Sequence, residues 1–342
     1  MRKVLVFLIA LTLCALMSGC QDDSKVVRVY NWGDYIDESV LDMFEEETGY
    51  KVNYSLFETP EDMYTKIVNS NASYDVIIPS DYMIERMATE GLLTEIDFNN
   101  VPEYKNIAEE YRNLSYDPEN KYSVPYMWGT MGILYNKTMI EGPITSWKDL
   151  WDEKYKGSIF MMNSQRDSIG ITLKMLGYSL NTTDEKELEE AKQALIEQSP
   201  LVLAYVVDEG KDKMIAGEAA LALAWAGDAV YCMKENSDLD YIIPKEGSNI
   251  FFDAMAIPKN CKNKEGAECF INFMCRPDIA ALNAKYIGYS SPNTEARKLM
   301  GKDGQNPVAY PDTTKYDLEI FTSLGDKVKI YDKIWTEVTS SF

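Results

Sequence analysis

The sequence contains no histidine and few cysteines. None of its 342 residues is His, and its six Cys include no Cys-X-X-Cys pair. Zinc and haem sites are built largely from these two residue types, so the sequence indicates no metal site and no cofactor. Cys269 and Cys275 lie six residues apart in a helical pattern, which is not a favourable spacing for a disulfide within one helix. We therefore expect buried free thiols at Cys232, Cys261, Cys269 and Cys275.

Basic residues are also scarce. The chain has 34 Lys and Arg against 55 Asp and Glu, which gives a formal net charge of −21. A strongly acidic protein is repelled by the phosphates of nucleic acids and by anionic membrane surfaces, so neither is expected as a partner. The charge favours a cationic partner instead.

The apolar run at residues 4–17 is too short to cross a bilayer. It is 14 residues long, follows two basic residues and precedes small residues, as a secretory signal does. The tripeptide Ser-Gly-Cys that ends at Cys20 is similar to a lipobox, where the new N-terminal Cys is acylated. We expect residues 1–19 to be a signal peptide and residues 20–25 to be a lipidated Cys and polar tether. The alternative is a plain secretion signal that happens to contain a Cys.

Patterns typical of strands and of helices alternate along the rest of the chain. Residues 26–29 predict a strand, and residues 38–48 predict a helix that ends at Gly49. This alternation predicts an α/β fold, with mainly parallel sheets flanked by helices, and the length suggests two domains. Further strands are predicted at residues 50–54, 74–78, 131–136, 159–162, 219–228, 241–244 and 249–258. Further helices are predicted from Thr59-Pro60, at 83–90, from Ser168, at 183–198, at 264–286 with an interruption at Arg276-Pro277, and at 318–339.

Three carboxylates are predicted at strand ends or within an apolar strand, each with an aromatic residue nearby. The pairs are Trp32 with Asp34, Trp225 with Asp228, and Phe251 with Asp253. In α/β sheets the carboxyl ends of the strands are where ligands bind. Aromatic faces beside a carboxylate suit an organic cation, through the ring quadrupole and through charge. The structural alternatives are that the rings cover the sheet edge, that Asp34 caps a helix, and that Asp253 forms a buried salt bridge.

Six short motifs stand in the order and context of a known family. They are Tyr-Asn-Trp at 30–32, Ile-Pro-Ser-Asp-Tyr at 78–82, Val-Pro-Tyr-Met-Trp-Gly at 124–129, Trp-Lys-Asp-Leu-Trp at 147–151, Trp-Ala-Gly-Asp at 225–228 and Ile-Gly-Tyr at 287–289. From about residue 26 to its C-terminus, the chain resembles the spermidine/putrescine-binding receptors of bacterial ABC importers.

This resemblance implies a two-lobed periplasmic-binding-protein fold of type II, with the ligand in a cleft between the lobes. Lobe 1 would comprise residues 26–130 plus 252–297, and lobe 2 residues 131–251 plus 298–342, with crossovers near Gly129 and Ile250 as the hinge. The protein would be a monomer and not an enzyme. It would be exported, anchored by lipid on the outer side of the cytoplasmic membrane or in the periplasm, and would deliver a polyamine to the permease subunits.

The resemblance also implies a set of ligand-binding residues. Trp32, Asp34 and Tyr35 would take one end of the polyamine with help from Ser80 and Tyr82, Trp225 and Phe251 would pack on its methylenes, Asp253 and Tyr289 would hold an ammonium, and Asp228 and Asp167 match acids of putrescine-type and spermidine-type receptors, respectively. Three positions depart from the pattern. Ser164 replaces an acid, Phe321 replaces a Gln expected in the last helix, and Gly33 replaces a hydroxyl residue. Putrescine and spermidine therefore both stay open as ligands.

Two other classes of function remain as alternatives. Paired carboxylates could serve glycoside hydrolysis, but the sequence has no G-x-S-x-G, P-loop, G-x-G-x-x-G or metal-ligand cluster. A receptor of the same fold could also bind another solute, such as a sugar or an agmatine-like cation.

Overall fold

The computed structural model describes residues 23–341. The predicted signal peptide and Cys20 lie outside the described residues. Within residues 23–341, no helix is both long enough and apolar enough to cross a membrane.

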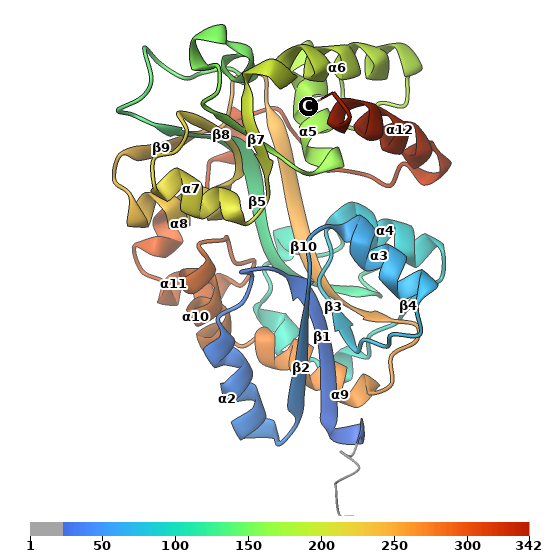
Figure 1. Cartoon of the computed structure of the whole chain (residues 1–342). Helices are drawn as coiled ribbons and strands as arrows, with labels where there is room; N and C mark the ends of the chain where they lie inside the picture. The colour runs from blue at the N-terminus through green and yellow to red at the C-terminus, as the bar shows by residue number, and fades with distance from the viewer. Residues whose placement is uncertain (1–22, 342) are drawn as a thin grey trace, which may run out of the picture.

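One continuous path of paired strands runs through the molecule in the order β2-β1-β3-β10-β5-β8-β6-β7 (Figure 1). The strands of the path are β1 (Val26–Trp32), β2 (Lys51–Phe57), β3 (Val76–Ile77), β5 (Ser123–Asn136), β6 (Ile159–Met162), β7 (Val202–Val206), β8 (Leu221–Trp225) and β10 (Ser248–Pro258). Three short strands pair beside it, namely β4 (Leu93–Thr94), β9 (Leu239–Ile242) and β11 (Leu318–Glu319).

Strand direction changes where the chain passes between the two halves of the molecule. The pairs β1–β2 and β1–β3 at one end, and β6–β7 and β6–β8 at the other, are parallel. The long strands β5 and β10 pair antiparallel to each other, with Thr130 opposite Ile250 and Gly129 opposite Phe251. The chain therefore crosses upward in β5 and returns in β10, which places both predicted crossovers side by side.

Helices cover the sheet on both faces and form two lobes (Figure 1). We call the half that contains β1–β3 the lower lobe and the half that contains β6–β8 the upper lobe. The lower lobe has α2 (Glu38–Thr48), α3 (Pro60–Asn69), α4 (Asp81–Thr89), α9 (Lys264–Met274), α10 (Pro277–Ile287) and α11 (Thr294–Leu299). The upper lobe has α5 (Gln165–Leu176), α6 (Glu185–Gln198), α7 (Glu209–Ile215), α8 (Ala226–Glu235) and α12 (Val328–Thr339). The α/β prediction is confirmed, and the residue boundaries assigned to the lobes remain a prediction.

Each lobe has its own apolar core. In the lower lobe, Phe44 of α2 packs edge-on against Phe270 and Phe273 of α9. In the upper lobe, Trp147 and Tyr331 are fully buried with Ile169 of α5. Burying apolar surface stabilises each lobe by roughly 25 cal/mol per Å² removed from water.

Local capping signals place several helices where the sequence predicts them. The Asp37 side chain accepts a hydrogen bond from the Ser39 backbone N–H and begins α2, and Gly49 ends it at φ +75°. Thr59 caps α3, whose first residue is Pro60. Because Asp37 is the cap of α2, the alternative that Asp34 caps a helix is wrong.

Several predicted boundaries differ from those of the structure. The strand predicted at residues 219–228 ends at Trp225, and α8 follows, so Asp228 lies in a first helical turn, where a carboxylate interacts favourably with the helix dipole. Helix α5 begins at Gln165 rather than at Ser168.

The closing helix, predicted from residue 318, begins only at Val328. Its expected first part is instead the edge strand β11, which pairs with β10, and the Glu319 side chain forms an ion pair with Lys174. These contacts join distant parts of the chain, so helical periodicity alone could not exclude them.

The four predicted thiols are free. Cys232 and Cys275 are buried, whereas Cys261 and Cys269 are partly exposed, so the expectation of burial is wrong for the latter two. Both of these residues are partly buried and pack against the core of the lower lobe.

Candidate functional site

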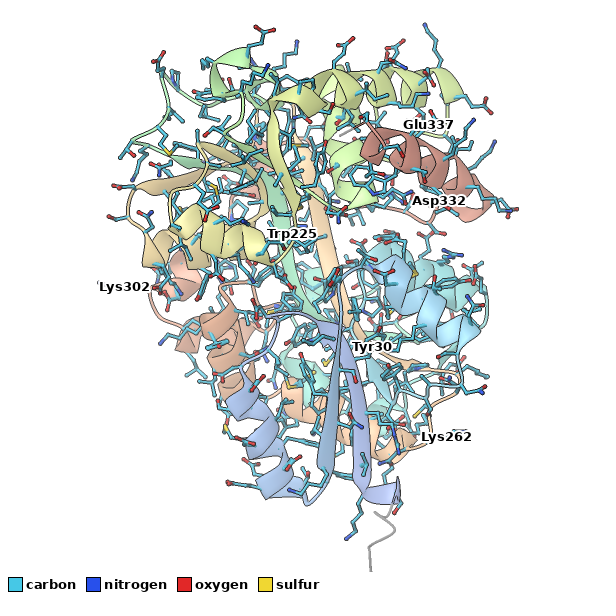
Figure 2. The ribbon with its side chains drawn as sticks, in the orientation of Figure 1. Tyr30, Trp225, Lys262, Lys302, Asp332 and Glu337 are labelled. Carbon is cyan, nitrogen blue, oxygen red and sulfur yellow. The ribbon has the colours of Figure 1, made fainter. Side chains whose placement is uncertain are left out.

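A cleft with about 770 Å³ of space, part of it open to solvent, lies where the two lobes meet. Figure 2 shows Trp225 at this level, with Tyr30 below it in the lower lobe. All eleven residues assigned to the ligand site from the sequence line the cleft, namely Trp32, Asp34, Tyr35, Ser80, Tyr82, Asp167, Trp225, Asp228, Phe251, Asp253 and Tyr289. The structure therefore brings together residues from both lobes that are far apart in the sequence.

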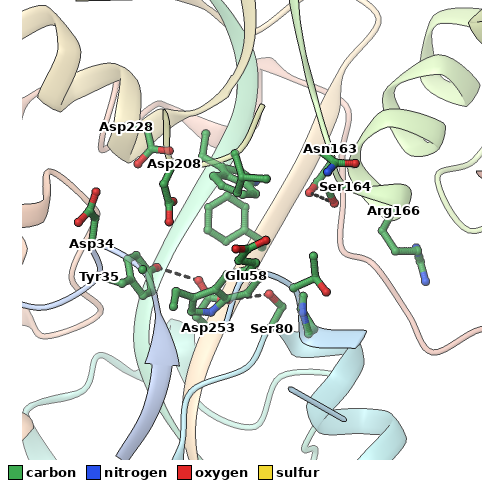
Figure 3. Close-up of a pocket in the computed structure, with 18 of the residues that line it drawn as sticks. Asp34, Tyr35, Glu58, Ser80, Asn163, Ser164, Arg166, Asp208, Asp228 and Asp253 are labelled. Atoms are coloured by element: carbon green, nitrogen blue, oxygen red, sulfur yellow. Dashed lines mark hydrogen bonds between the residues drawn. The ribbon is translucent and has the colours of Figure 1, made fainter. Parts of the chain in front are cut away.

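Asp253 stands at the floor of the cleft and is held by two hydroxyl groups (Figure 3). The Ser80 hydroxyl donates to Oδ1 and the Tyr35 hydroxyl to Oδ2, both at 2.7 Å. The side chain is buried, and this burial raises its carboxyl pKa to about 6 despite the two donors. Within residues 23–341, no Lys or Arg forms an ion pair with Asp253, so the alternative of a buried salt bridge finds no support. A buried carboxylate without a cation favours an external cationic partner.

Asp167 is the second buried carboxylate, and it comes from the upper lobe. It lies in the first turn of α5, and the Ser164 hydroxyl donates a hydrogen bond to its Oδ2 at 2.6 Å. Burial raises the pKa of Asp167 to about 6, against the lowering effect of the Ser164 hydrogen bond. Ser164 therefore orients Asp167. The sequence showed Ser164 only as the replacement of an acid and did not reveal this role.

A third group of carboxylates surrounds an amine of the protein itself. Lys211 Nζ lies 3.1 Å from Asp34 Oδ2 and 3.9 Å from Asp228 Oδ1. Asp208 lines the same part of the cleft, and Figure 3 shows Asp34, Asp208 and Asp228 on one side of the view, opposite Ser164. Burial raises the pKa of Asp208 and of Asp228, whereas Lys211 lowers both.

Aromatic rings separate these charged positions. Trp32 and Trp225, from opposite lobes, stand edge to face with ring centroids 6.2 Å apart. The ring centroids of Tyr289 and Tyr35 lie 4.7 Å apart in an edge-to-face arrangement, and those of Tyr289 and Phe251 lie 6.3 Å apart. Such faces can pack against methylene groups and attract ammonium groups.

Tyr82 and Phe321 meet a buried cation at the wall of the cleft. The Arg166 guanidinium lies 5.0 Å from the Tyr82 ring centroid and 4.5 Å from that of Phe321. The Tyr82 hydroxyl donates to Glu61 Oε1 at 3.0 Å. Phe321, expected in a helix, lies in the segment between β11 and α12. The Tyr82 hydroxyl is thus engaged by Glu61, while the residue lines the cleft.

Four charged residues that line the cleft were not predicted from the sequence. They are Glu58, Arg166, Asp208 and Lys211. Asp208 follows β7 by two residues and Lys211 lies in the first turn of α7, so both stand near the carboxyl end of a strand. That signal could have been found had the strand at residues 202–206 been predicted.

The sequence matches the family of bacterial extracellular solute-binding proteins over residues 39–336. It is 37% identical over 321 residues to the spermidine/putrescine-binding periplasmic protein of Escherichia coli, covering 93% of this chain and 92% of that protein.

Two solved structures are also similar. A putative spermidine/putrescine ABC transporter protein from Listeria monocytogenes is 41% identical, with a TM-score of 0.90 over 92% of this chain and 99% of that one. The spermidine/putrescine ABC transporter substrate-binding protein of Streptococcus pneumoniae is also 41% identical, with a TM-score of 0.78 over 93% of this chain and 99% of that one. The predicted binding-protein fold is thereby confirmed.

Proposed function

Because the chain belongs to the family of bacterial extracellular solute-binding proteins, we propose that it is a polyamine receptor of an ABC importer. The observation that best supports this proposal is the lining of the cleft, which combines six carboxylates with two cationic side chains. A linear amine with charged ends and an apolar middle matches carboxylates separated by aromatic faces. The relatives whose names include spermidine and putrescine support the same ligand class.

The proposal gives each part of the cleft a task. Asp253 pairs with one ammonium while Ser80 and Tyr35 fix its carboxylate oxygens. At about 4 Å and an effective dielectric near 20, such a pair gains on the order of 4 kcal/mol before desolvation costs. Asp167 pairs with a second ammonium, and the rings of Trp225 and Phe251 pack against the methylenes between them.

Closure of the lobes completes the site. Asp253 reaches the cleft from β10 in the lower lobe and Asp167 from α5 in the upper lobe, so both contact one ligand only when the lobes are close. The paired strands β5 and β10 are the connection that must bend. Binding energy then favours the closed form, which is the form a permease can distinguish from the empty receptor.

Calorimetry with putrescine, spermidine, agmatine and glucose tests the ligand class. We expect both polyamines to bind with micromolar or tighter dissociation constants, about −8 kcal/mol. In a melting experiment, an amine at 100 times its dissociation constant should add about 2.7 kcal/mol to the free energy of unfolding. A response to agmatine or glucose without a response to either polyamine would instead support a receptor of the same fold for another solute.

The proposal includes a membrane anchor. Ser-Gly-Cys at residues 18–20 and the polar residues after it suggest acylation of Cys20, which would hold the receptor beside its permease on the outer face of the membrane. One acyl chain binds a membrane only reversibly, so stable retention needs two or three.

A further inference from the structure

The amine of Lys211 occupies one end of the cleft. We call Lys211 together with Asp34, Asp208 and Asp228 the Lys211 cluster. Its amine is paired with Asp34 at 3.1 Å and approaches Asp228 at 3.9 Å. The Asp208 side chain packs closely against the backbone of Gly33, because a Cβ atom at Gly33 would lie 2.2 Å from Asp208 Oδ2. The cluster is therefore compact and spans the two lobes.

The Lys211 side chain is largely buried in this position, although its nearest partner, Asp34, is exposed. The Lys211 side chain is 11% exposed and that of Asp228 is 15% exposed. Burial acts to lower the pKa of Lys211, but Asp228, Asp208 and Asp34 together raise it, so the amine stays protonated at neutral pH. It has the chemistry and the charge of one ammonium group of a polyamine.

Carboxylates occur at three places along the cleft, and Lys211 satisfies one of them. The other two places are Asp253 and Asp167, and within residues 23–341 neither forms an ion pair with a Lys or Arg. Arg166 lowers the pKa of Asp167 by its charge, but its guanidinium lies over the Tyr82 and Phe321 rings. Glu58 also lines the cleft but is exposed, where solvent and salt screen its charge. Two buried carboxylates that form no ion pair within the described residues match the two ammonium groups of a diamine.

We propose that Lys211 is a specificity-determining residue, a tethered ammonium that fills the third cationic position and makes the cleft prefer diamines over triamines. This inference rests on the proposed function. The additional ammonium of a triamine such as spermidine would have to approach the Lys211 amine, and two like charges would then share one set of carboxylates. Removing the amine frees those carboxylates for the ligand.

Calorimetry on Lys211→Met and Lys211→Gln tests the proposal, with putrescine and spermidine as probes. Met keeps the length of the side chain, and Gln keeps a hydrogen-bond donor for Asp34 or Asp228 without the charge. Lys213→Met is the matched control, because Lys213 lies on the same helix, pairs with Glu218 at 3.5 Å and does not line the cleft.

We expect the wild type to bind putrescine more tightly than spermidine. Both Lys211 variants should shift the ratio of the two dissociation constants at least tenfold toward spermidine, while Lys213→Met leaves the ratio unchanged. An unchanged ratio in a Lys211 variant that binds either amine overturns the inference, and so does a wild type that binds spermidine as tightly as putrescine. A wild type that binds neither amine contradicts the proposed function itself, which is a different result.

Discussion

The Tyr289 hydroxyl donates a hydrogen bond to Asp228 Oδ1 at 3.0 Å, joining the lower lobe to the upper lobe at the edge of the cleft. Gly227 makes this contact possible, because a Cβ atom there would lie 1.9 Å from Cδ2 of the Tyr289 ring. The ring therefore packs directly on the backbone at the start of α8. The close approach of the Tyr289 ring therefore explains why residue 227, next to Asp228, is a glycine.

The variant Gly227→Ala should weaken polyamine binding at least tenfold. The added methyl group cannot coexist with the Tyr289 ring, so the lobes must separate at this point or the ring must leave the cleft. Calorimetry measures the loss. Tyr289→Phe, which removes only the hydroxyl, should cost less, because Asp228 keeps Lys211 nearby. Wild-type affinity in Gly227→Ala would show that this contact is not needed for binding.

The variant Asp253→Asn should lower polyamine affinity at least a hundredfold, while the melting temperature of the ligand-free protein stays level or rises. Asn keeps the shape of the side chain, and it removes a buried charge that no cation of the described chain balances. Titration calorimetry and thermal melting measure the two quantities.

Asp75→Asn is the matched control for this variant. Asp75 is also buried in the lower lobe, but it accepts hydrogen bonds from the backbone of Arg28, Lys262 and Asn263 and does not line the cleft. Its replacement should lower the melting temperature and leave affinity intact. If Asp253→Asn melts early yet binds polyamine normally, Asp253 is not the ammonium anchor.

Polyamine affinity should fall as the pH drops through 6. The pKa values of Asp253 and Asp167 are each raised to about 6 by burial, and both carboxyls must be ionised to pair with ammonium groups. Between pH 7 and pH 5 each carboxyl should cost roughly tenfold and the two together roughly a hundredfold. In Asp253→Asn one of these two protonations is lost, so its affinity should vary less steeply with pH. A wild-type affinity that is flat from pH 7 to pH 5 would contradict this assignment.

The stability of the ligand-free protein should change with pH in the opposite sense. The raised pKa means that the folded state holds two protons that the unfolded state has already released between about pH 4 and pH 6. These two carboxyls therefore favour folding at low pH and lose that contribution as the pH rises through 6. Chemical denaturation of the wild type and of Asp253→Asn at pH 5 and pH 7 isolates the contribution of Asp253.

Saturating putrescine should reduce the radius of gyration measured by X-ray scattering. The lobes are joined by β5 and β10, and their cleft carboxylates are drawn together by a shared ligand. An unchanged radius would count against closure, provided that the ligand-free protein is open. Lys211→Met tests that proviso, because loss of the ion pair between Lys211 and Asp34 removes a contact that can hold the empty lobes together.

The variant Cys20→Ala should release the protein from membranes. The prediction follows from the Ser-Gly-Cys tripeptide at residues 18–20, because without the thiol no thioether-linked lipid can form. Fractionation of cells that express the wild type or the variant gives the result. If both appear equally in the soluble fraction, the protein has a plain secretion signal instead.

Local chemistry is enough to predict much of this protein. Asp37 and Gly49 bound α2 through side-chain capping and a left-handed backbone, both of which depend on neighbouring residues alone. Period-two alternation places Phe251 and Asp253 on one face of β10, and both line the cleft. The aromatic and acidic residues at strand ends were predictable because parallel strands present those ends at one edge of a sheet.

The sequence by itself determined the α/β class, the acidic character and eleven of the residues that gather in the cleft. Only the tertiary structure decided which charges meet there. Lys211 pairs with Asp34, Ser164 orients Asp167, and the segment at residue 318 becomes a strand rather than a helix. The first two pairings depend on distances of a few Å between side chains in the folded protein. The third outcome depends on backbone pairing between residues 318–319 and β10. The energies of hydrogen bonds and ion pairs fall steeply as the two groups separate, so a local sequence pattern cannot predict which groups will pair.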